Sequence, residues 1–166
     1  MGESKKILVT YASRYGSTAE VAQAIAAQLC ARGEDVDVRS VTDVTDVSPY
    51  RAVVVGSAVR MGQWLAPAVK FVKAHRDALS QVPVAYFTVH MLAVDDSEAS
   101  RQKRAAYLAP VRAILAPRHE AFFTRKIDSR QFTLLDRLMT KATGSVDGDQ
   151  RNWQAIRSWA DQIFVN

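Results

Sequence analysis

The segment Tyr11-Ala12-Ser13-Arg14-Tyr15-Gly16-Ser17-Thr18 places hydroxyl side chains and a glycine directly before a run with helical periodicity. Main-chain N–H groups at the start of a helix have no partner within the helix, and the helix dipole favours negative charge there. The segment therefore predicts a site for a phosphate group. Alternatively, the serine and threonine side chains only cap the helix, and the segment alone does not separate the two interpretations.

Two other phosphate-binding patterns are missing from the sequence. No Gly-x-Gly-x-x-Gly follows the first apolar run, and no Gly-Lys-Ser/Thr ends the segment. Because the first pattern marks dinucleotide sites and the second marks nucleoside triphosphate sites, we expect neither ligand.

Apolar runs that alternate with helical patterns position this segment. The predicted strands are Lys6–Thr10, Val36–Val38, Ala52–Gly56, Val82–Val89 and Ala121–Thr124. The predicted helices cover Val21–Leu29, Leu65–Leu79, Ser97–Leu115 and Trp153–Ile163. Strands that alternate with helices predict a parallel sheet with right-handed crossovers.

In such a sheet, ligands bind beyond the carboxyl ends of the strands, where the strand order reverses. The loops at that edge follow the first, third and fourth predicted strands. They are Thr10–Thr18, Gly56–Trp64 and Thr88–Val94.

The pattern Tyr11-x-Ser13-x-x-Gly16-x-Thr18-x-x-x-Ala22-x-x-Ile25 resembles the FMN-phosphate signature of the flavodoxin-like proteins, with Thr10 standing where an apolar residue is usual. Three further stretches are similar to the menaquinone-dependent protoporphyrinogen dehydrogenase branch of that family: Val55–Gly62, Phe87–Val89 and Leu135–Met139. The resemblance implies an α/β fold with one flavodoxin-like domain over residues 1–166. It implies a three-layer sandwich around a five-stranded parallel sheet of order 2-1-3-4-5, with an insertion between the last strand and the last helix.

The resemblance also implies that FMN is the cofactor. The first loop would hold the phosphate, and the second and third loops would flank the isoalloxazine ring. The cofactor-binding residues that it implies are Ser13, Arg14, Tyr15, Gly16, Ser17, Thr18, Ser57, Ala58, Val59, Arg60, Met61, Gly62, Trp64, Thr88, Val89, His90, Met91 and Leu92.

Several of these residues have a second interpretation. Gly62 permits a peptide rearrangement that brings a carbonyl to the reduced flavin N5, or it serves only a tight turn. Trp64 stacks on the flavin or packs under the following helix. Tyr15 and Met61 are the other candidates for the ring faces, with ordinary surface or core packing as the alternative.

The net charge of +5 bears on function. The basic residues are spread along the chain, so nucleic acid is not expected as a partner. Arg14, Arg60 and His90 would surround the ring with positive charge, which predicts a less negative reduction potential, suited to a quinone acceptor. Arg60 and His90 are also the candidates for contact with substrate carboxylates, against the alternative that both are simply solvated.

Residues 127–150 combine an apolar stripe with basic side chains. Such a segment suits a membrane surface, a quinone enzyme or the interface of a homodimer. Alternatively, it covers one end of its own domain, which is the usual place for an apolar stripe.

The remaining signals concern compartment and metal. Cys30 is the only cysteine, so no internal disulfide can form, and the N-terminus lacks the pattern of a secretory signal. Both observations predict a cytoplasmic protein, with peripheral contact at the inner face of the membrane if residues 127–150 bind there. Cys30 is expected to be buried on the apolar face of its helix. His75 and His119 have no ligand spacing, so we predict no metal.

These patterns, with the resemblance, leave two functions. The first is an FMN-dependent oxidoreductase that passes electrons from a reduced substrate, protoporphyrinogen IX among the candidates, to a quinone. The second is an electron carrier without a substrate, which docks to redox proteins. A carrier would form weak, salt-dependent complexes, whereas the enzyme would consume quinone in steady state.

Overall fold

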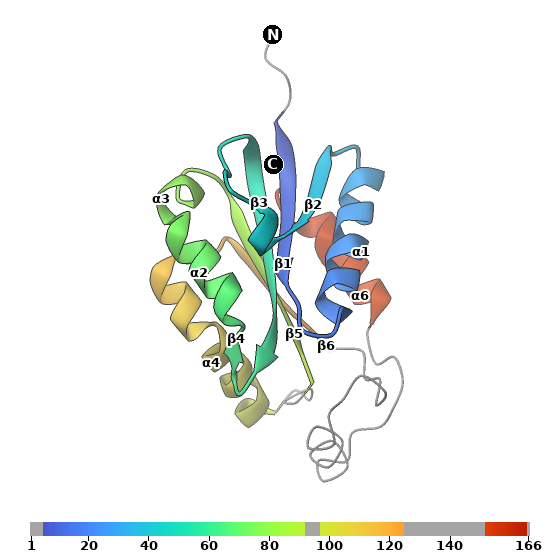
Figure 1. Ribbon diagram of the computed structural model, residues 1–166. Helices are drawn as coiled ribbons and strands as arrows, with labels where there is room; N and C mark the ends of the chain where they lie inside the picture. Colours follow the sequence, from blue (N-terminus) through green and yellow to red (C-terminus); the bar gives the residue numbers. More distant parts are fainter. Residues whose placement is uncertain (1–4, 92–96, 125–151, 166) are drawn as a thin grey trace.

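The computed structural model describes residues 5–91, 97–124 and 152–165, and within them a central sheet carries helices on both faces (Figure 1). The strands are β1 Lys6–Ala12, β2 Val36–Ser40, β3 Tyr50–Arg60, β4 Gln63–Trp64, β5 Val84–His90 and β6 His119–Thr124. The helices are α1 Ser17–Ala31, α2 Ala66–Ala74, α3 Arg76–Leu79, α4 Glu98–Ile114 and α6 Trp153–Gln162, with a 3-10 turn η1 at Val41–Asp43.

The strand order is β2-β1-β3-β5-β6, and every pair along it is parallel. The short β4 lies off this path and pairs antiparallel with the end of β3. Counted over the parallel strands, this is the predicted order 2-1-3-4-5, and the flavodoxin-like α/β fold is confirmed. The insertion at residues 127–150 lies outside the described residues, and the single domain over 1–166 stays a prediction.

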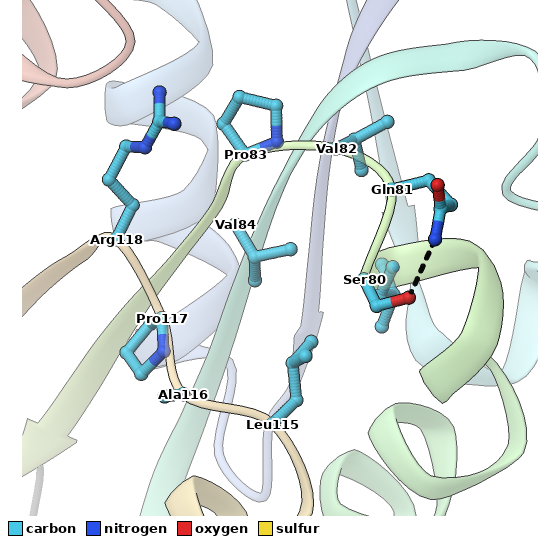
Figure 2. Close-up of a pocket in the computed structure, with 10 residues that line it drawn as sticks. Ser80, Gln81, Val82, Pro83, Val84, Leu115, Ala116, Pro117 and Arg118 are labelled. Carbon is cyan, nitrogen blue, oxygen red and sulfur yellow. Dashed lines mark hydrogen bonds between the residues drawn. The ribbon is translucent and has the colours of Figure 1, made fainter.

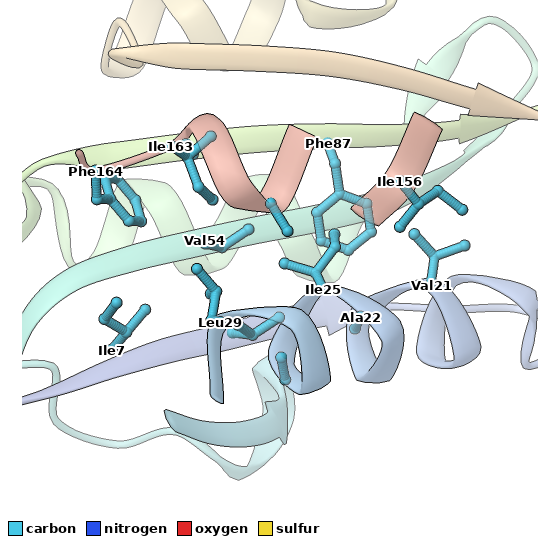
Figure 3. Close-up of a cluster of buried hydrophobic side chains, with 14 of the residues drawn as sticks. Ile7, Val21, Ala22, Ile25, Leu29, Val54, Phe87, Ile156, Ile163 and Phe164 are labelled. Atoms are coloured by element: carbon cyan, nitrogen blue, oxygen red, sulfur yellow. The ribbon is translucent and has the colours of Figure 1, made fainter. Parts of the chain in front are cut away.

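Helices α1 and α6 cover one face of the sheet (Figure 3). The apolar residues of α1 recur on one side of the helix and meet α6 and alternate residues of the strands, because side chains along a strand point to opposite faces. The largest fully buried members are Ile7, Ile25, Leu29, Phe87, Ile156 and Ile163. This face is a closed apolar layer of aliphatic and aromatic side chains.

Helices α2, α3 and α4 cover the other face. Leu8, Val53, Val55 and Tyr86 point to this side, where they pack with Trp64 and with residues of the helices. The predicted helix Leu65–Leu79 is divided at His75, which ends α2 and precedes α3. Pro67 lies in the first turn of α2, where its missing N–H has no helical partner to lose.

Gly56 makes room for a ring on the neighbouring strand. It pairs with Phe87 on β5, and a Cβ atom at Gly56 would lie 1.9 Å from the Phe87 ring. The ring therefore occupies the space that any other residue at position 56 would need.

Two expectations need correction. Cys30 is exposed rather than buried, because it lies in the last turn of α1, one position and about 100° around the helix from buried Leu29. The third strand was expected to end at Gly56, yet β3 continues to Arg60, because its end is extended by pairing with β4.

Candidate functional site

The first predicted loop forms a tight turn before α1. The Gly16 N–H donates to Ser13 Oγ at 2.9 Å, and Gly16 has φ +83°, a conformation that glycine adopts without strain. Gly16 is also the N-cap of α1 and supplies no side-chain cap. The helix therefore begins without the hydroxyl cap that was the alternative explanation of this loop.

Thr18 carries the most informative atom of the site. The residue is 1 % exposed, and among the described residues its Oγ1 has no hydrogen-bond partner. Leaving a buried hydroxyl without a partner costs about 1–3 kcal/mol. An anion seated at the start of α1 would accept this hydrogen bond.

A small hollow of about 10 Å³ lies at this place. It is lined by Ser13, Arg14, Tyr15, Ser17, Thr18 and Ala58. The first loop and the end of β3 thus meet as the carboxyl-edge rule predicts. The Arg14 guanidinium lies 4.8 Å from the centre of the Tyr15 ring, so that ring stacks with a cation in this structure.

These features fit the phosphate of a flavin mononucleotide. The loop offers the start of a fifteen-residue helix, a glycine at its N-cap and a buried hydroxyl without a partner among the described residues. Backbone N–H groups and a hydroxyl are the donors that phosphate oxygens accept from.

The second predicted loop is a β-hairpin. β3 and β4 pair Arg60 with Gln63, so Met61 and Gly62 form a two-residue turn in which φ is 54° and 76°. Positive φ at both central residues is the type I′ geometry, which matches the twist of a hairpin. Gly62 therefore lies in a tight turn, and the peptide rearrangement beside a flavin stays a prediction. Met61 adopts a conformation that costs a residue with a side chain about 1 kcal/mol.

Ser57 fixes the base of this hairpin. Its Oγ donates to the Ala58 carbonyl at 2.8 Å and accepts from the Leu65 N–H at 2.9 Å. Leu65 is the N-cap of α2, so one buried hydroxyl joins the end of β3 to the start of the next helix. Val59 is half-buried and pairs with Trp64 across the hairpin.

Trp64 lies inside the core. It is 4 % exposed, its Nε1 donates to Thr88 Oγ1 at 2.9 Å, and its ring packs edge-on against Tyr86 at 5.1 Å between centroids. Of the two positions expected for Trp64, the structure has the packed one and not the one stacked on a flavin. A Trp N–H that is buried needs such a partner, which Thr88 supplies.

The third predicted segment ends β5. Thr88, Val89 and His90 are buried, Met91 is half-buried, and Leu92 lies outside the described residues. The His90 ring lies 6.0 Å from that of Tyr107 and 6.1 Å from that of Phe122.

The two candidate catalytic residues therefore differ in setting. His90 is 4 % exposed and lies beside the rings of Tyr107 and Phe122. Arg60 is exposed on the hairpin.

A cavity of about 520 Å³ lies beside the hairpin, between α2 and α4. Its residues are Arg60, Met61, Gln63, Trp64, Leu65, Ala66, Val69, Lys70, Lys73, Tyr107, Pro110 and Val111. Sequence reasoning named only the hairpin members of this set. The spacing of Lys70 and Lys73, three residues apart on one helix face, was the available signal for the α2 side. The contribution of α4 depends on tertiary packing and had none.

A second cavity, of about 410 Å³, lies at the opposite edge of the sheet, where Ser80–Val84 and Leu115–Arg118 lead into β5 and β6 (Figure 2). Ligands of parallel α/β sheets bind at the carboxyl edge, so this cavity is not the candidate site.

Metal sites and membrane-spanning helices are two further features that bear on function. No group of three or more His, Cys, Asp or Glu side chains within the described ranges could hold a metal ion. Over the same part of the chain, no helix is long and apolar enough to span a membrane.

Comparison with protein families agrees with this geometry. A family model described as a flavodoxin domain matches residues 8–153. The chain belongs to the flavodoxin domain family. The match includes the phosphate loop, the hairpin and the end of β5.

A curated relative indicates which branch of the family the chain resembles. Over 90 residues the chain is 31 % identical to protoporphyrinogen IX dehydrogenase [quinone] of Escherichia coli strain K12, a match that covers 53 % of this chain and 50 % of the relative. The chain thus spans about half the length of this curated relative. The predicted resemblance to that branch is confirmed.

Solved structures share the fold at low sequence identity. A flavodoxin from the domain Archaea superposes with a TM-score of 0.56 at 19 % identity and covers 95 % of both chains. A flavoprotein from Lactobacillus acidophilus NCFM, solved in complex with FMN, gives a TM-score of 0.52 at 14 % identity, over 72 % of this chain and 93 % of its own. Family and fold together indicate a flavin cofactor.

Proposed function

We propose that the chain binds FMN at the Ser13–Thr18 loop and passes electrons from a reduced substrate to a quinone. The observation that carries the cofactor assignment is the buried Thr18 hydroxyl at the start of α1, which has no partner among the described residues. The reaction is supported by the similarity to protoporphyrinogen IX dehydrogenase [quinone], whose name supplies both the substrate and the acceptor class.

The residues of the loop would have different roles in binding the phosphate. Backbone N–H groups of the first turn of α1 and the Thr18 hydroxyl would donate to the phosphate, and Ser13 would hold the turn through Gly16. The buried Ser57 hydroxyl would keep the hairpin at the ring. Bound FMN would supply the redox chemistry, taking electrons from one molecule and giving them to another.

Charge supports the choice of acceptor. Arg14 on the phosphate loop and Arg60 on the hairpin are both exposed cations. Positive charge beside a group stabilises its anionic form, so these side chains would raise the reduction potential of a flavin between them. A potential that is not very low suits transfer to a quinone.

The test is anaerobic and uses the full chain loaded with FMN. We expect protoporphyrinogen IX to reduce the flavin, so that its visible absorption bands decrease. Menadione, a soluble quinone, should restore these bands and should be consumed in steady state. Reduction by redox proteins without any consumption of quinone would instead make the chain an electron carrier. A very low potential in a redox titration would contradict the charge argument.

A further inference from the structure

The cavity between α2 and α4 combines an apolar interior with a cationic rim. Leu65, Val69, Pro110 and Val111 contribute apolar walls, and Trp64 adds its buried indole. Arg60, Lys70 and Lys73 also line it, all three exposed. Within the described part of the chain, no acidic residue lines this cavity.

The three cations are available for a ligand. Among the described residues, none of the three forms an ion pair, whereas Arg32, Arg51 and Arg112 are each paired with a glutamate. Helix α4 adds Lys103 and Arg104 to the same positive field, whereas its Arg101 and Arg112 are paired with Glu98 and Glu120. Unpaired cations beside an apolar wall favour a ligand that is itself apolar and anionic.

The walls favour an apolar body. Tyr107 is 8 % exposed, and burial raises the pKa of its phenol, so this wall stays neutral. Met61 stands at the hairpin with 92 % of its surface exposed, which places an additional apolar side chain beside the opening. A volume of about 520 Å³ falls within the range of pockets that enclose small organic ligands.

We propose that the α2–α4 cavity binds the reduced substrate, an apolar ring compound that carries carboxylates, with its ring against Leu65, Val69 and Pro110 and its carboxylates at Arg60, Lys70 and Lys73. This assignment rests on the proposed function and deepens it by naming the binding site of the substrate. The cavity shares Arg60, Met61 and Trp64 with the hairpin segment that is predicted to flank the flavin. A ligand bound there would therefore lie against the same hairpin as the cofactor.

The experiment measures binding of protoporphyrin IX to the FMN-loaded full chain by fluorescence anisotropy of the porphyrin. Its dimethyl ester, which has the same ring without the charges, is the matched ligand. We expect saturable binding of the dicarboxylate and binding of the ester that is weaker by about tenfold, an effect that decreases with added salt. Equal affinity for acid and ester would overturn the role of the cations.

Variants locate the site. Lys70→Gln combined with Lys73→Gln should weaken binding of the dicarboxylate about tenfold, because it removes two of the three cations that line the cavity. Lys5→Gln combined with Arg157→Gln removes the same charge from exposed positions outside the α2–α4 layer and should leave binding unchanged. Ala66→Phe places a ring in the cavity from an exposed position and should weaken both ligands. Equal weakening by both charge variants, or full binding by Ala66→Phe, would overturn the site.

Turnover with menadione separates this inference from the proposed function. Binding that depends on Lys70 and Lys73 in a chain that consumes no quinone would support the cavity and contradict the reaction. Turnover with a KM that is unchanged in the double lysine variant would support the reaction and overturn the cavity.

Discussion

The two helical layers of the sheet are built differently. The α1–α6 layer is apolar and nearly neutral, with Glu20 as the one charged side chain of α1 and one cation and one acid on α6. The α2–α4 layer carries Lys70 and Lys73 on α2, four cations against one acid on α4, and the cavity of about 520 Å³. Figure 1 shows the two layers on opposite faces of one sheet.

This difference concerns binding rather than packing. Both layers gain stability from burying apolar surface. The α2–α4 layer has in addition a cavity and unpaired cations, which can attract an anion. We therefore expect stability effects at buried residues of either layer and effects on the substrate in the α2–α4 layer.

The largest expected loss of stability is at Phe87, which points into the closed layer. Phe87→Ala should lower the free energy of unfolding by about 3–5 kcal/mol, the usual cost of removing a buried ring. Tyr86→Phe, at the neighbouring residue that faces the other layer, removes only the hydrogen bond to the Leu115 carbonyl and should cost about 1 kcal/mol. Urea denaturation measures both, and equal losses would mean that the Phe87 ring contributes no more to stability than the Tyr86 hydroxyl.

Gly56 and Phe87 should be coupled. Gly56→Ala alone should cost about 1–3 kcal/mol, because the new methyl group would overlap the Phe87 ring. In a Phe87→Ala background the overlap is gone and most of that cost should disappear. A double-mutant cycle by urea denaturation with no coupling would show that the ring does not set the size limit at position 56.

Arg32 should matter more than its counterpart in the other layer. Its Nη1 donates to the carbonyls of Ala160, Asp161 and Ile163 at the end of α6, so Arg32→Met should cost about 2 kcal/mol. Among the described residues Arg76 donates only from its Nε to the Ile114 carbonyl, and its exposed setting predicts a cost of about 0.5 kcal/mol or less for Arg76→Met. Thermal unfolding of both variants checks the order, and the reverse order would contradict it.

Thr10 offers a stabilising change. Its side chain is fully buried on β1, and within the described part of the chain its hydroxyl has no partner. Thr10→Val should raise the free energy of unfolding by about 1 kcal/mol, because a methyl group replaces an unsatisfied hydroxyl. A loss of stability in urea denaturation would mean that the hydroxyl is hydrogen-bonded in solution.

The smallest expected effect is a pH dependence at His119. Its Nε2 accepts from the Phe164 N–H at 3.3 Å, and burial, with Arg118 nearby, lowers the pKa of its ring below 6.5. The unfolded chain therefore binds a proton first as the pH falls. The contribution of His119 to the free energy of unfolding should be fully present above about pH 6.5. It should decrease as the pH is lowered from there, until the folded form is also protonated. His119→Gln should flatten that part of the curve, and a curve that is unchanged by the substitution would remove His119 as its cause.

Local patterns were enough to predict the sheet and the phosphate loop. The continuous apolar run Ala52–Val55 marks a strand that is buried on both faces, and Gly16 and Thr18 stand where a helix begins. Both signals depend on residues that are neighbours in the sequence, so they can be recognised without knowledge of the tertiary structure.

Features that depend on distant residues could not be predicted. The packed position of Trp64 depends on Thr88, and one wall of the cavity depends on α4, which follows far along the chain. β4 was missed for a local reason: its two residues, which follow the turn at Met61 and Gly62, are too few for the alternation that predicts a strand. Cys30 was placed wrongly because a helical pattern does not tell how far its last turn is covered.

The affinity for FMN and for riboflavin, measured in the wild-type chain and in Thr18→Val, tests the central claim most directly. We expect FMN to bind the wild-type chain more tightly than riboflavin does. Thr18→Val should lower the affinity for FMN by about tenfold, the effect of one hydrogen bond to a charged group, and should leave the affinity for riboflavin unchanged. The same substitution should stabilise the flavin-free chain, because Thr18 Oγ1 then has no partner to lose among the described residues. Equal affinity for the two flavins, or equal loss of both in Thr18→Val, would contradict a phosphate site at Ser13–Thr18.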